Sequence, residues 1–398
     1  MKKMVIKKKD IFYFILYTFM LIPFFKIPYI SVVIPKISVL YKILAISAFG
    51  LSFLMLLKNK ILSKFELFTF IFCLILLLST FLNSGDLNQC ILLVVSCITL
   101  TFVIGHGLKK NTKTFLNAFE FLLYVPVVIN FFTIILIPNG LYASDSISFY
   151  TTNNWFLGFK NNHIIFIIPA ILVSLINSYY TNNKLSKRTI ILMIISLINL
   201  ILVKSATGLV GVILITVLLF FGDIRKKTKP INVNSLMYTN IGMFFAIVIF
   251  RLQELFKFLI VDIFHKDITL TGRIYIWDYV MEFIKNKPIL GYGIEDLKTR
   301  YYKTSYMQSY HAHNQILEVL YKTGFIGFFI LVYIFYLSIK QLNKYKLNRC
   351  SKVISIVLFA ELIMMLTEAY SLENIFILLG FGYNIGYLVK TEEEYAKK

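Results

Sequence analysis

The stretch "SYHAHNQILEVLYKTGFIGFFILVYIFY" (residues 309–336) combines a polar beginning with an apolar run that is long enough to cross a lipid bilayer. Its first residues include His311, His313 and Asn314, and the whole chain has only five histidines. From Ile316 onward most residues are apolar, and about 20 such residues make a transmembrane helix. The stretch therefore predicts a membrane helix whose mouth carries two imidazoles.

The composition of the chain agrees with a membrane protein. Of its 398 residues, 58% are hydrophobic, whereas soluble domains have about 45–50%, and the mean hydropathy is +0.75. Long apolar runs recur along the sequence and leave no room for a large soluble domain. We therefore predict an all-α polytopic membrane protein in which residues 1–398 form a single integral membrane domain.

Hydropathy predicts about 12 transmembrane helices. They lie near residues 10–25, 37–57, 65–82, 87–105, 115–137, 163–178, 189–203, 207–222, 235–261, 312–339, 353–367 and 372–389. The first segment resembles a signal peptide but lacks a small-residue cleavage site, so we expect it to be a retained span. Residues 262–311 then form a large extracytoplasmic loop, and residues 138–162 form a second outer loop.

The positive charges test this topology. The formal net charge is +21, and with the N-terminus inside, the predicted inner loops and both termini hold 26 of the 41 lysines and arginines. Inner loops are enriched in these residues by the positive-inside rule. The charge therefore predicts cytoplasmic N- and C-termini and contact with anionic membrane lipid, and it does not indicate a nucleic-acid partner.

The larger outer loop contains a pattern of its own. In "RIYIWDYVMEFIKN" (residues 273–286) apolar residues recur at helical spacing, which predicts a short amphipathic helix. The following "KPILGYG" ends this helix in a turn that contains Gly291 and Gly293. Tyr275 and Trp277 on the helix are candidates for stacking on sugars, and anchoring at the membrane interface is the alternative.

The two histidines of the first stretch are predicted to point in different directions. If a helix begins near His311, then one side of it holds His311, Asn314, Gln315 and Glu318. His313 would lie about 200° round the axis from His311, so only one of the two would face a site. Histidines that cap the helix, or that are solvated among lipid headgroups, are the alternative interpretation.

Three cations lie on or near the predicted outer face. Arg273 begins the amphipathic segment and is a candidate for a pyrophosphate clamp, because guanidinium binds phosphate oxygens through two hydrogen bonds. Lys160 in "GFKNNH" is a candidate for a second phosphate contact, and Arg251 at the end of the ninth span is a weaker one. The alternatives are that Arg273 anchors the protein at lipid headgroups, that Lys160 is a solvated loop lysine, and that Arg251 extends its side chain to the membrane interface.

Several motifs of other enzyme classes are absent from the sequence. It contains no Asp-x-Asp, no Walker-type glycine loop and no His-Glu-x-x-His. Its four cysteines have neither metal-ligand spacing nor a disulfide pattern. An enzyme with this sequence is therefore expected to act on an already activated substrate, without a metal or another cofactor.

Two blocks of the sequence resemble a known family. "TGRIYIWDYVMEFIKNKPILGYG" and "HAHNQILEVLYKTGFIGFFI" are similar to the conserved region of the O-antigen polymerase and ligase superfamily (Wzy-type). The family pattern has an arginine and a tryptophan before an amphipathic helix, then Pro-x-x-Gly-x-Gly, then His-Asn, nine residues and Gly-x-x-Gly. The matching residues in this sequence are Arg273, Trp277, Pro288, Gly291, Gly293, His313, Asn314, Gly324 and Gly327.

Two further segments resemble the family more loosely. "WFLGFKNNHIIF" is similar to its Gly-x-Phe-x-Asn-x-Asn motif, and "LVKSATGLVGVIL" is similar to its Thr-x-Ser-Arg-Gly motif. In the second segment Ala206 stands where an arginine is common. Ligase members often carry threonine and a further histidine after the last glycine, whereas this chain has Phe328 there. That difference favours a polymerase over a ligase.

The resemblance implies a GT-C-like fold and a metal-independent glycosyltransferase in the bacterial cytoplasmic membrane. It implies that the enzyme joins polyprenyl-diphosphate-linked oligosaccharide repeat units on the outer face, for capsule, O-antigen or a related surface glycan. A ligase that passes the glycan to lipid A core or cell wall is the alternative, and a transporter or flippase is a third possibility. A chain-length regulator and a flippase are the protein partners that the resemblance allows.

The resemblance also implies roles for single residues. His313 is expected to accept the proton of the attacking hydroxyl, and Arg273 to stabilise the leaving diphosphate. The expected substrate-binding residues are Lys160, Arg251, His311, Asn314, Trp277, Tyr275 and Glu318. Gly291 and Gly293 are expected to shape the loop, and Gly324 and Gly327 to allow close helix packing.

Overall fold

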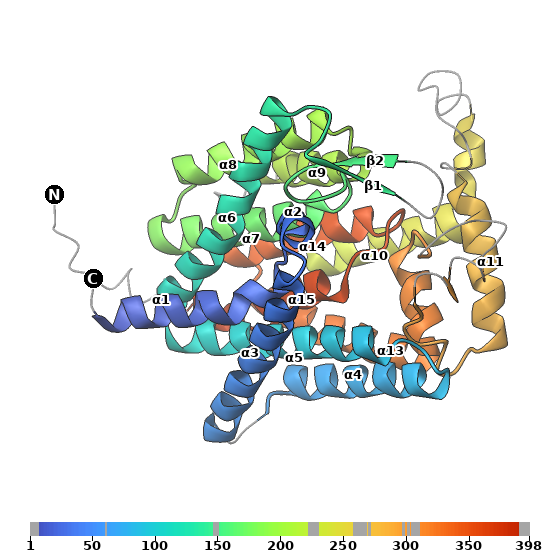
Figure 1. The fold of residues 1–398 in the computed structure, drawn as a ribbon, viewed down its shortest axis with the longest axis horizontal. Coiled ribbons are helices and arrows are strands. Elements are labelled where there is room, and N and C mark those ends of the chain that lie inside the picture. The colour runs from blue at the N-terminus through green and yellow to red at the C-terminus, as the bar shows by residue number, and fades with distance from the viewer. Residues whose placement is uncertain are drawn as a thin grey trace.

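The computed structural model describes residues 8–59, 62–145, 151–221, 231–257, 269, 272–296, 299–300, 303 and 311–389. Each of the twelve predicted spans contains a helix (Figure 1). These helices are α1 (Lys8–Leu21), α3 (Ile37–Asn59), α4 (Lys64–Leu82), α5 (Leu87–Lys110), α6 (Thr112–Leu136), α7 (His163–Asn182), α8 (Lys187–Leu202), α9 (Ala206–Phe221), α10 (Val233–Phe244), α13 (Gln315–Lys344), α14 (Arg349–Met364) and α15 (Leu372–Tyr383). The all-α polytopic fold predicted from the sequence is confirmed.

Six of these helices are long and apolar enough by length and composition to cross a membrane, namely α3, α4, α5, α6, α7 and α13. They differ in how deeply they lie inside the protein. The apolar part of α7 is 83% buried, whereas that of α3 is 22% buried. The helix α7 is therefore central, and α3 presents most of its surface outward, which suits a helix that faces lipid.

The ninth span is shorter than predicted. The sequence predicts one helix over residues 235–261, but α10 ends at Phe244 and continues as one π-helical turn, η2 (Phe245–Ile249). Arg251 follows with φ of 54°, a left-handed conformation through which an α-helix does not continue. A short 3₁₀ turn, η3 (Leu252–Phe256), begins directly after it.

The segments between the spans contribute short elements. Near the N-terminus these are η1 (Ile22–Phe24) and α2 (Pro28–Val33). The smaller predicted outer loop holds an antiparallel hairpin of β1 (Tyr142–Asp145) and β2 (Thr151–Asn154), which the sequence did not predict. The larger predicted outer loop holds α11 (Arg273–Asn286), where the amphipathic helix was predicted, and its apolar residues Ile274, Val280 and Ile284 are buried.

Loops that follow odd-numbered spans contact one another. Loops one and five meet where the Tyr29 N–H donates to Phe156 O at 3.4 Å, and loops three and nine meet where the Asp86 N–H donates to Ile294 O at 2.7 Å. Loops five and eleven meet where Asn161 donates to Glu368. These loops therefore lie at one end of the bundle, as the predicted topology requires.

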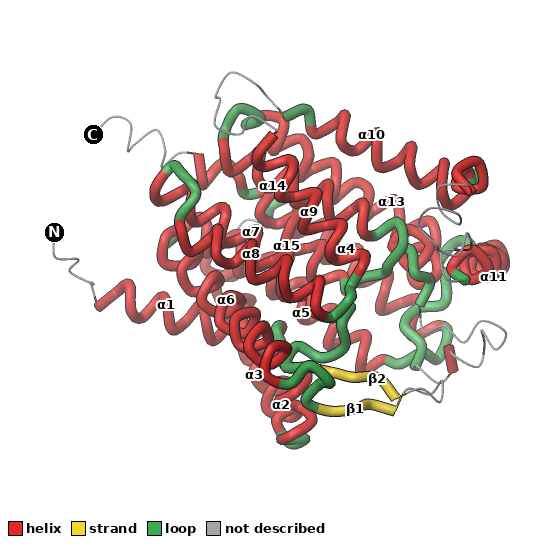
Figure 2. The backbone as a smooth tube through the Cα atoms, turned by 90° about the horizontal axis from the view of Figure 1, so that it is seen from above, coloured by secondary structure: helices red, strands yellow, loops and turns green. Residues whose placement is uncertain are grey.

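The helix α11 lies at this same end. In Figure 1 it runs across the direction of α4, α5 and α13 instead of along it, and Figure 2 shows it at the edge of the bundle, seen along its axis. Its inner face packs on α13 through Trp277 and Tyr321 in a second, smaller apolar core. The start of α13 is thus covered by α11.

Candidate functional site

The start of α13 is held by Asn314. Its side-chain Oδ1 accepts from the Leu317 N–H at 3.0 Å and caps the helix, while its Nδ2 donates to Leu366 O at 2.9 Å. Two further bonds join this point to the loop between α14 and α15, since the Gln315 N–H donates to Met365 O and Gln315 Oε1 accepts from the Tyr370 N–H. The capping residue Asn314 and its neighbour Gln315 therefore also hold residues 365–371 against the N-terminal end of α13.

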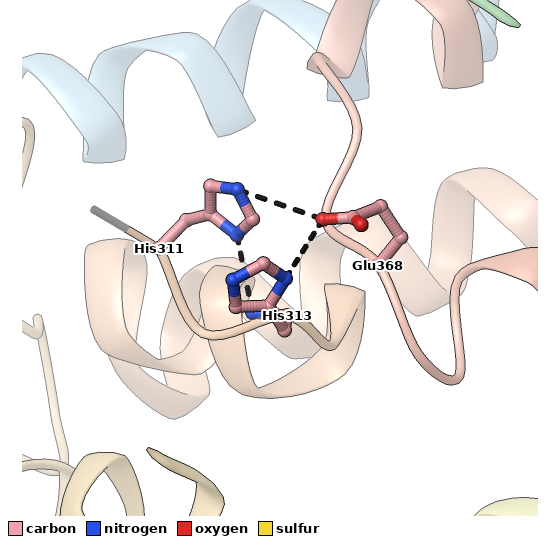
Figure 3. Close-up of side chains that lie close together, drawn as sticks. All are labelled: His311, His313 and Glu368. Atoms are coloured by element: carbon pink, nitrogen blue, oxygen red, sulfur yellow. Dashed lines mark hydrogen bonds and ion pairs between the residues drawn. The ribbon is translucent and has the colours of Figure 1, made fainter. Parts of the chain in front are cut away.

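The expectation that the two histidines diverge is wrong. The helix begins at Gln315 and not near His311, and His313 has φ of 47°, so residues 311–313 do not follow helical geometry. The two imidazole rings lie 4.0 Å apart, centroid to centroid. Both point toward Glu368, as Figure 3 shows.

Glu368 joins the imidazoles to Arg273. Its Oε1 lies 3.0 Å from Nδ1 of His313 and 3.5 Å from Nε2 of His311, and its Oε2 lies 3.2 Å from Nη2 of Arg273. The Glu368 side chain is only 5% exposed. Burial by itself raises the pKa of Glu368, but the hydrogen bond and charge of His313, together with His311 and Arg273, outweigh it and hold this pKa below its ordinary value.

The hydrogen bonds decide which imidazole nitrogen is free. A carboxylate only accepts hydrogen bonds, so Nδ1 of His313 must carry the proton and act as the donor of the hydrogen bond to Glu368. Nε2 of His313 then has a lone pair that can accept a proton. In His311 the lone pair of Nδ1 accepts from the His313 backbone N–H at 3.2 Å. Burial and the neighbouring His313 lower the pKa of His311 to about 4. The geometry therefore favours His313 over His311 as the base.

The helix α11 supports this arrangement from behind. Arg273 is its first residue and follows Gly272, whose φ of 81° turns the chain into the helix. Trp277 is 1% exposed, and its indole N–H donates to His313 O at 3.4 Å. Trp277 thus holds the backbone of His313, and its burial does not fit the predicted stacking on sugars. Tyr275 is 53% exposed and keeps both of its predicted alternatives.

The glycine motifs form one joint. Gly324 has φ of 59° and ψ of −166°, so it interrupts α13. The turn after α11 fills the break: the Tyr292 N–H donates to Tyr321 O at 2.7 Å, and the Phe325 N–H donates to Pro288 O at 2.7 Å. Gly291 has φ of 68° and lies against the Tyr321 carbonyl, where a side chain would not fit. Gly293, with φ of 73°, is packed against Thr80 in the same way.

This joint corrects the expected role of the later glycines. Gly324 permits close packing of a turn against a kinked helix, and not of two helices against each other. Gly327 lies one turn further along α13, where the nearest neighbour of an added Cβ is Thr323 of the same helix. Gly291 and Gly324 therefore anchor the turn after α11 to α13, and Gly293 packs the same turn against Thr80 of α4, so these three glycines fix α11 relative to His313.

Glu318 also has a role that differs from the predicted one. Both of its oxygens bind Arg300, at 2.8 and 2.7 Å, and Oε2 accepts from the Ala312 N–H at 2.9 Å. Lys322 lies 2.9 Å from Oε1. Burial alone would lower the pKa of Arg300, but Glu318 raises it. Glu318 therefore holds the outer loop and the segment before His313 in place instead of facing a substrate.

The two remaining predicted cations lie apart from Glu368. Arg251 forms an ion pair with Asp278 on α11. The ammonium of Lys160 lies 5.9 Å from the ring centroid of Phe159, and among the described residues it makes no ion pair. The neighbouring Asn161, not Lys160, reaches the site, since its Nδ2 donates to Oε2 of Glu368 at 3.4 Å.

The same cluster contains a candidate metal site. One ligand atom from each of His311, His313 and Glu368 lies within 4.8 Å of the others. However, both Nδ1 atoms are already hydrogen-bonded, and the Arg273 guanidinium lies against the same carboxylate. A cation would have to displace these bonds and approach a like charge, so the arrangement suits proton transfer better than metal binding.

Part of the chain matches the model of a known family. Residues 191–332 match the family model described as O-antigen ligase. A candidate polysaccharide ligase of Rickettsia felis is 34% identical over 84 residues, which are 19% of this chain and 21% of that protein. The exopolysaccharide production protein ExoQ of Rhizobium meliloti is 35% identical over 83 residues, 18% of this chain and 19% of that protein.

The matches cover only part of each relative. A candidate polysaccharide ligase of Rickettsia typhi is 27% identical over 200 residues, which are 47% of this chain and 42% of that protein. The matched family region contains Arg273 and His313, whereas Glu368 lies beyond it. The match of residues 191–332 confirms the resemblance to the O-antigen polymerase and ligase superfamily, and the chain is a multi-pass membrane protein.

Three residues at the site were not found from the sequence. Glu368 lies in "LTEAYS" between the last two spans, Arg300 lies in the larger predicted outer loop, and Asn161 directly follows the predicted Lys160. The predicted topology puts the loop of Glu368 on the same side as His313, which was the available signal. The pairing of Glu368 with His313 and Arg273, and of Arg300 with Glu318, depends on how segments that are distant in the sequence pack. Residue spacing within a segment does not predict such packing.

Proposed function

We propose that this chain is a glycosyltransferase that joins polyprenyl-diphosphate-linked oligosaccharide repeat units at the outer face of a bacterial cytoplasmic membrane, with both termini in the cytoplasm. The observation that carries the proposal is the contact of one buried carboxylate, Glu368, with both an imidazole and a guanidinium. Glycosyl transfer from a diphosphate needs these two groups. It needs a proton acceptor at the attacking hydroxyl and a positive charge at the leaving group.

The reaction is a substitution at the anomeric carbon. A hydroxyl of the acceptor sugar forms the new glycosidic bond, while the bond from the anomeric carbon to the diphosphate oxygen breaks and its electron pair leaves with the diphosphate. The hydroxyl proton passes to Nε2 of His313, and the Nδ1–H of His313 remains bonded to Glu368. The carboxylate stabilises the imidazolium that forms, as in other carboxylate–histidine pairs.

Arg273 is suited to the leaving group. A guanidinium has five N–H donors, and among the described residues one bond of Arg273, to Glu368, is seen. Its side chain is 20% exposed, so its other donors remain open to phosphate oxygens. Before reaction the charges of Arg273 and Glu368 offset each other. Proton uptake by His313 adds one positive charge as the diphosphate becomes free, which favours the products of the step.

A ligase is the second candidate. The description of the matched family model and the name of the Rickettsia felis relative favour transfer to a different acceptor, such as lipid A core or cell wall. Phe328, in place of the threonine and histidine common in ligases, favours polymerisation. Both use the same donor and the same site chemistry. A chain-length regulator and a flippase are proposed partners of the polymerase form.

Transport receives less support. Glu120, one of the mid-span carboxylates, is bound by Arg188 at 2.5 Å and by Ser174 at 2.9 Å. These contacts join α6, α7 and α8, so Glu120 has the environment of a structural ion pair rather than of a transport pathway. The metal-independent mechanism remains part of the proposal, since the cluster is already internally hydrogen-bonded.

The proposal is tested by reconstitution. The lipid-linked glycan that accumulates in cells lacking this gene is purified and added to the full chain in proteoliposomes. A ladder of products with one glycan alone supports the polymerase, and a single transfer that requires an added acceptor supports the ligase. The rate is expected to be unchanged by EDTA. No release of polyprenyl diphosphate under any of these conditions would contradict glycosyl transfer.

A further inference from the structure

The two oxygens of the buried Glu368 carboxylate are held by different donors. Oε1 accepts from Nδ1 of His313 at 3.0 Å and from the Ala369 N–H at 3.4 Å. Oε2 accepts from Nη2 of Arg273 at 3.2 Å and from Nδ2 of Asn161 at 3.4 Å. Among the described residues these are the two donors to Oε2. One oxygen thus supports the base, and the other is shared between a charged donor and a neutral one.

The proposed reaction draws Arg273 away from Oε2. Its guanidinium stabilises the leaving diphosphate, which carries more negative charge than one carboxylate and binds guanidinium through two hydrogen bonds. When Arg273 turns to the diphosphate, its bond to Glu368 weakens or breaks. The Glu368 side chain is only 5% exposed, so bulk water does not replace the lost donor. Asn161 is then the described residue that still donates to Oε2.

The loop that carries Asn161 is fixed on both sides of it. Before it, the Leu157 N–H donates to Oδ1 of Asn130 at 2.9 Å. After it, Nε2 of His163 donates to Gly158 O at 3.1 Å and so closes the loop around Asn161. Asn130 and His163 are both 0% exposed. The loop is therefore tied to buried side chains of α6 and α7, which holds the Asn161 amide beside the carboxylate.

We propose that Asn161 is a positioning residue that holds Glu368 against His313 while Arg273 binds the diphosphate. The inference rests on the proposed function. The Asn161 amide is neutral, so it satisfies Oε2 and leaves the negative charge of Glu368 available to the imidazolium of His313. Its bond to Oε2 is long, at 3.4 Å, and can shorten once Arg273 has left the same oxygen. Asn161 acts through Glu368 and not by contact with the reacting atoms.

The kinetic test uses the full chain in proteoliposomes with the purified lipid-linked glycan. Asn161→Ala is expected to lower kcat about 10- to 100-fold, as for the loss of one hydrogen bond to a charged group. It is expected to leave KM within about threefold of wild type, because the substrate is not contacted. Asn162→Ala is the matched control: Asn162 is the next residue, is exposed and has no side-chain hydrogen bond among the described residues, so this variant should react at the wild-type rate.

A double-mutant cycle separates positioning from a general loss of structure. If Asn161 acts only through Glu368, the double variant Asn161→Ala/Glu368→Gln should have the kcat of Glu368→Gln alone, to within about twofold. Losses that multiply would overturn the assignment, and so would a wild-type kcat for Asn161→Ala. A raised KM with an unchanged kcat would also overturn it, because that result would place Asn161 in contact with the substrate.

A second measurement needs no turnover. Solid-state NMR of the full chain, isotope-labelled at histidine and held in lipid bilayers, follows the Nδ1–H proton of His313, whose signal is identified by its loss in His313→Gln. Arg273→Ala imitates the state in which the guanidinium has left Oε2. In that background Asn161→Ala is expected to shift the signal upfield, because Glu368 is no longer held on His313, and Asn162→Ala is expected not to shift it. An unchanged signal in Arg273→Ala/Asn161→Ala would overturn the positioning role.

The two proposals fail in different ways. If the wild-type chain releases polyprenyl diphosphate but neither kcat nor the NMR signal responds to Asn161→Ala, the positioning role is refuted and the glycosyltransferase stands. If the NMR signal depends on Asn161 but no polyprenyl diphosphate is released under any condition, glycosyl transfer is refuted, while the hold of Asn161 on Glu368 stands.

Discussion

Replacing Glu368 by glutamine changes one oxygen of the site to an amide nitrogen and removes its negative charge. His313 then loses the charged acceptor for its Nδ1–H, and Arg273 loses its ion pair. The amide can also donate toward Nδ1, which would favour the tautomer with the proton on Nε2. In that tautomer His313 cannot accept the proton of the attacking hydroxyl. We therefore expect a slower reaction with little change in the fold.

The size of the loss follows from the distance between the two charges. Unit charges 3.0 Å apart attract each other by about 1.4 kcal/mol at a dielectric constant of 80 and by about 5.5 kcal/mol at 20. These limits correspond to about tenfold and about 10⁴-fold in rate. The His313 side chain is 26% exposed and that of Glu368 is 5% exposed, so the effective dielectric constant lies between these two limits. We expect a loss of about 100- to 1,000-fold.

The assay follows release of polyprenyl diphosphate from the lipid-linked glycan under saturating conditions. Glu361→Gln is the matched control, because Glu361 is a buried carboxylate of α14 whose two oxygens have no hydrogen-bond partner among the described residues. It is expected to keep the wild-type rate. A Glu368→Gln protein that folds normally and reacts within about threefold of wild type would refute the role assigned to the carboxylate.

Three further predictions concern stability. Unfolded His311 takes up a proton near pH 6.5 and folded His311 only near pH 4, so the free energy of unfolding should fall as the pH drops through this window. The expected loss is about 1–2 kcal/mol after allowance for the 34% exposure of the side chain. The melting temperature of His311→Gln should depend less on pH in this window than that of the wild type. Gly324→Ala should lower the free energy of unfolding by about 2–3 kcal/mol, because φ is 59° and the new Cβ meets the Ile289 carbonyl. Gly50→Ala is the control and should not lower it, because its Cβ meets nothing within 4 Å. Glu318→Gln should lower the free energy of unfolding by about 3–5 kcal/mol, because it removes the carboxylate that binds the buried Arg300. Hydrogen exchange at residues 292–296 and 311–314 should rise, and unchanged exchange there would contradict the role of the ion pair.

Much of the fold follows from the sequence because its signals are local. Runs of apolar residues identify all twelve helix positions, and the spacing of Ile274, Trp277 and Val280 identifies α11. The ninth helix was predicted too long, because hydropathy does not detect a residue such as Arg251 that turns left-handed within an apolar segment. The β-hairpin was missed for a similar reason, since its two strands are polar and only four residues long.

The site follows from the sequence only in part. The motifs identify His313, Asn314 and Arg273, but they do not reveal that Glu368 joins two of them. Hydrogen bonds from Asn314 and Gln315 to residues 366 and 370 bring Glu368 to the mouth of α13. These bonds link segments more than 50 residues apart. Helical spacing also misled for His311 and His313, because both precede the helix.

The most direct test of glycosyl transfer from a lipid diphosphate at His313 is the rate of His313→Gln on one purified lipid-linked glycan. His106→Gln is its control, since His106 lies near the other end of the bundle, where it bonds to Tyr17. We expect His313→Gln to release polyprenyl diphosphate about 10²- to 10⁴-fold more slowly, while His106→Gln reacts at the wild-type rate. Equal rates for wild type and His313→Gln would contradict it.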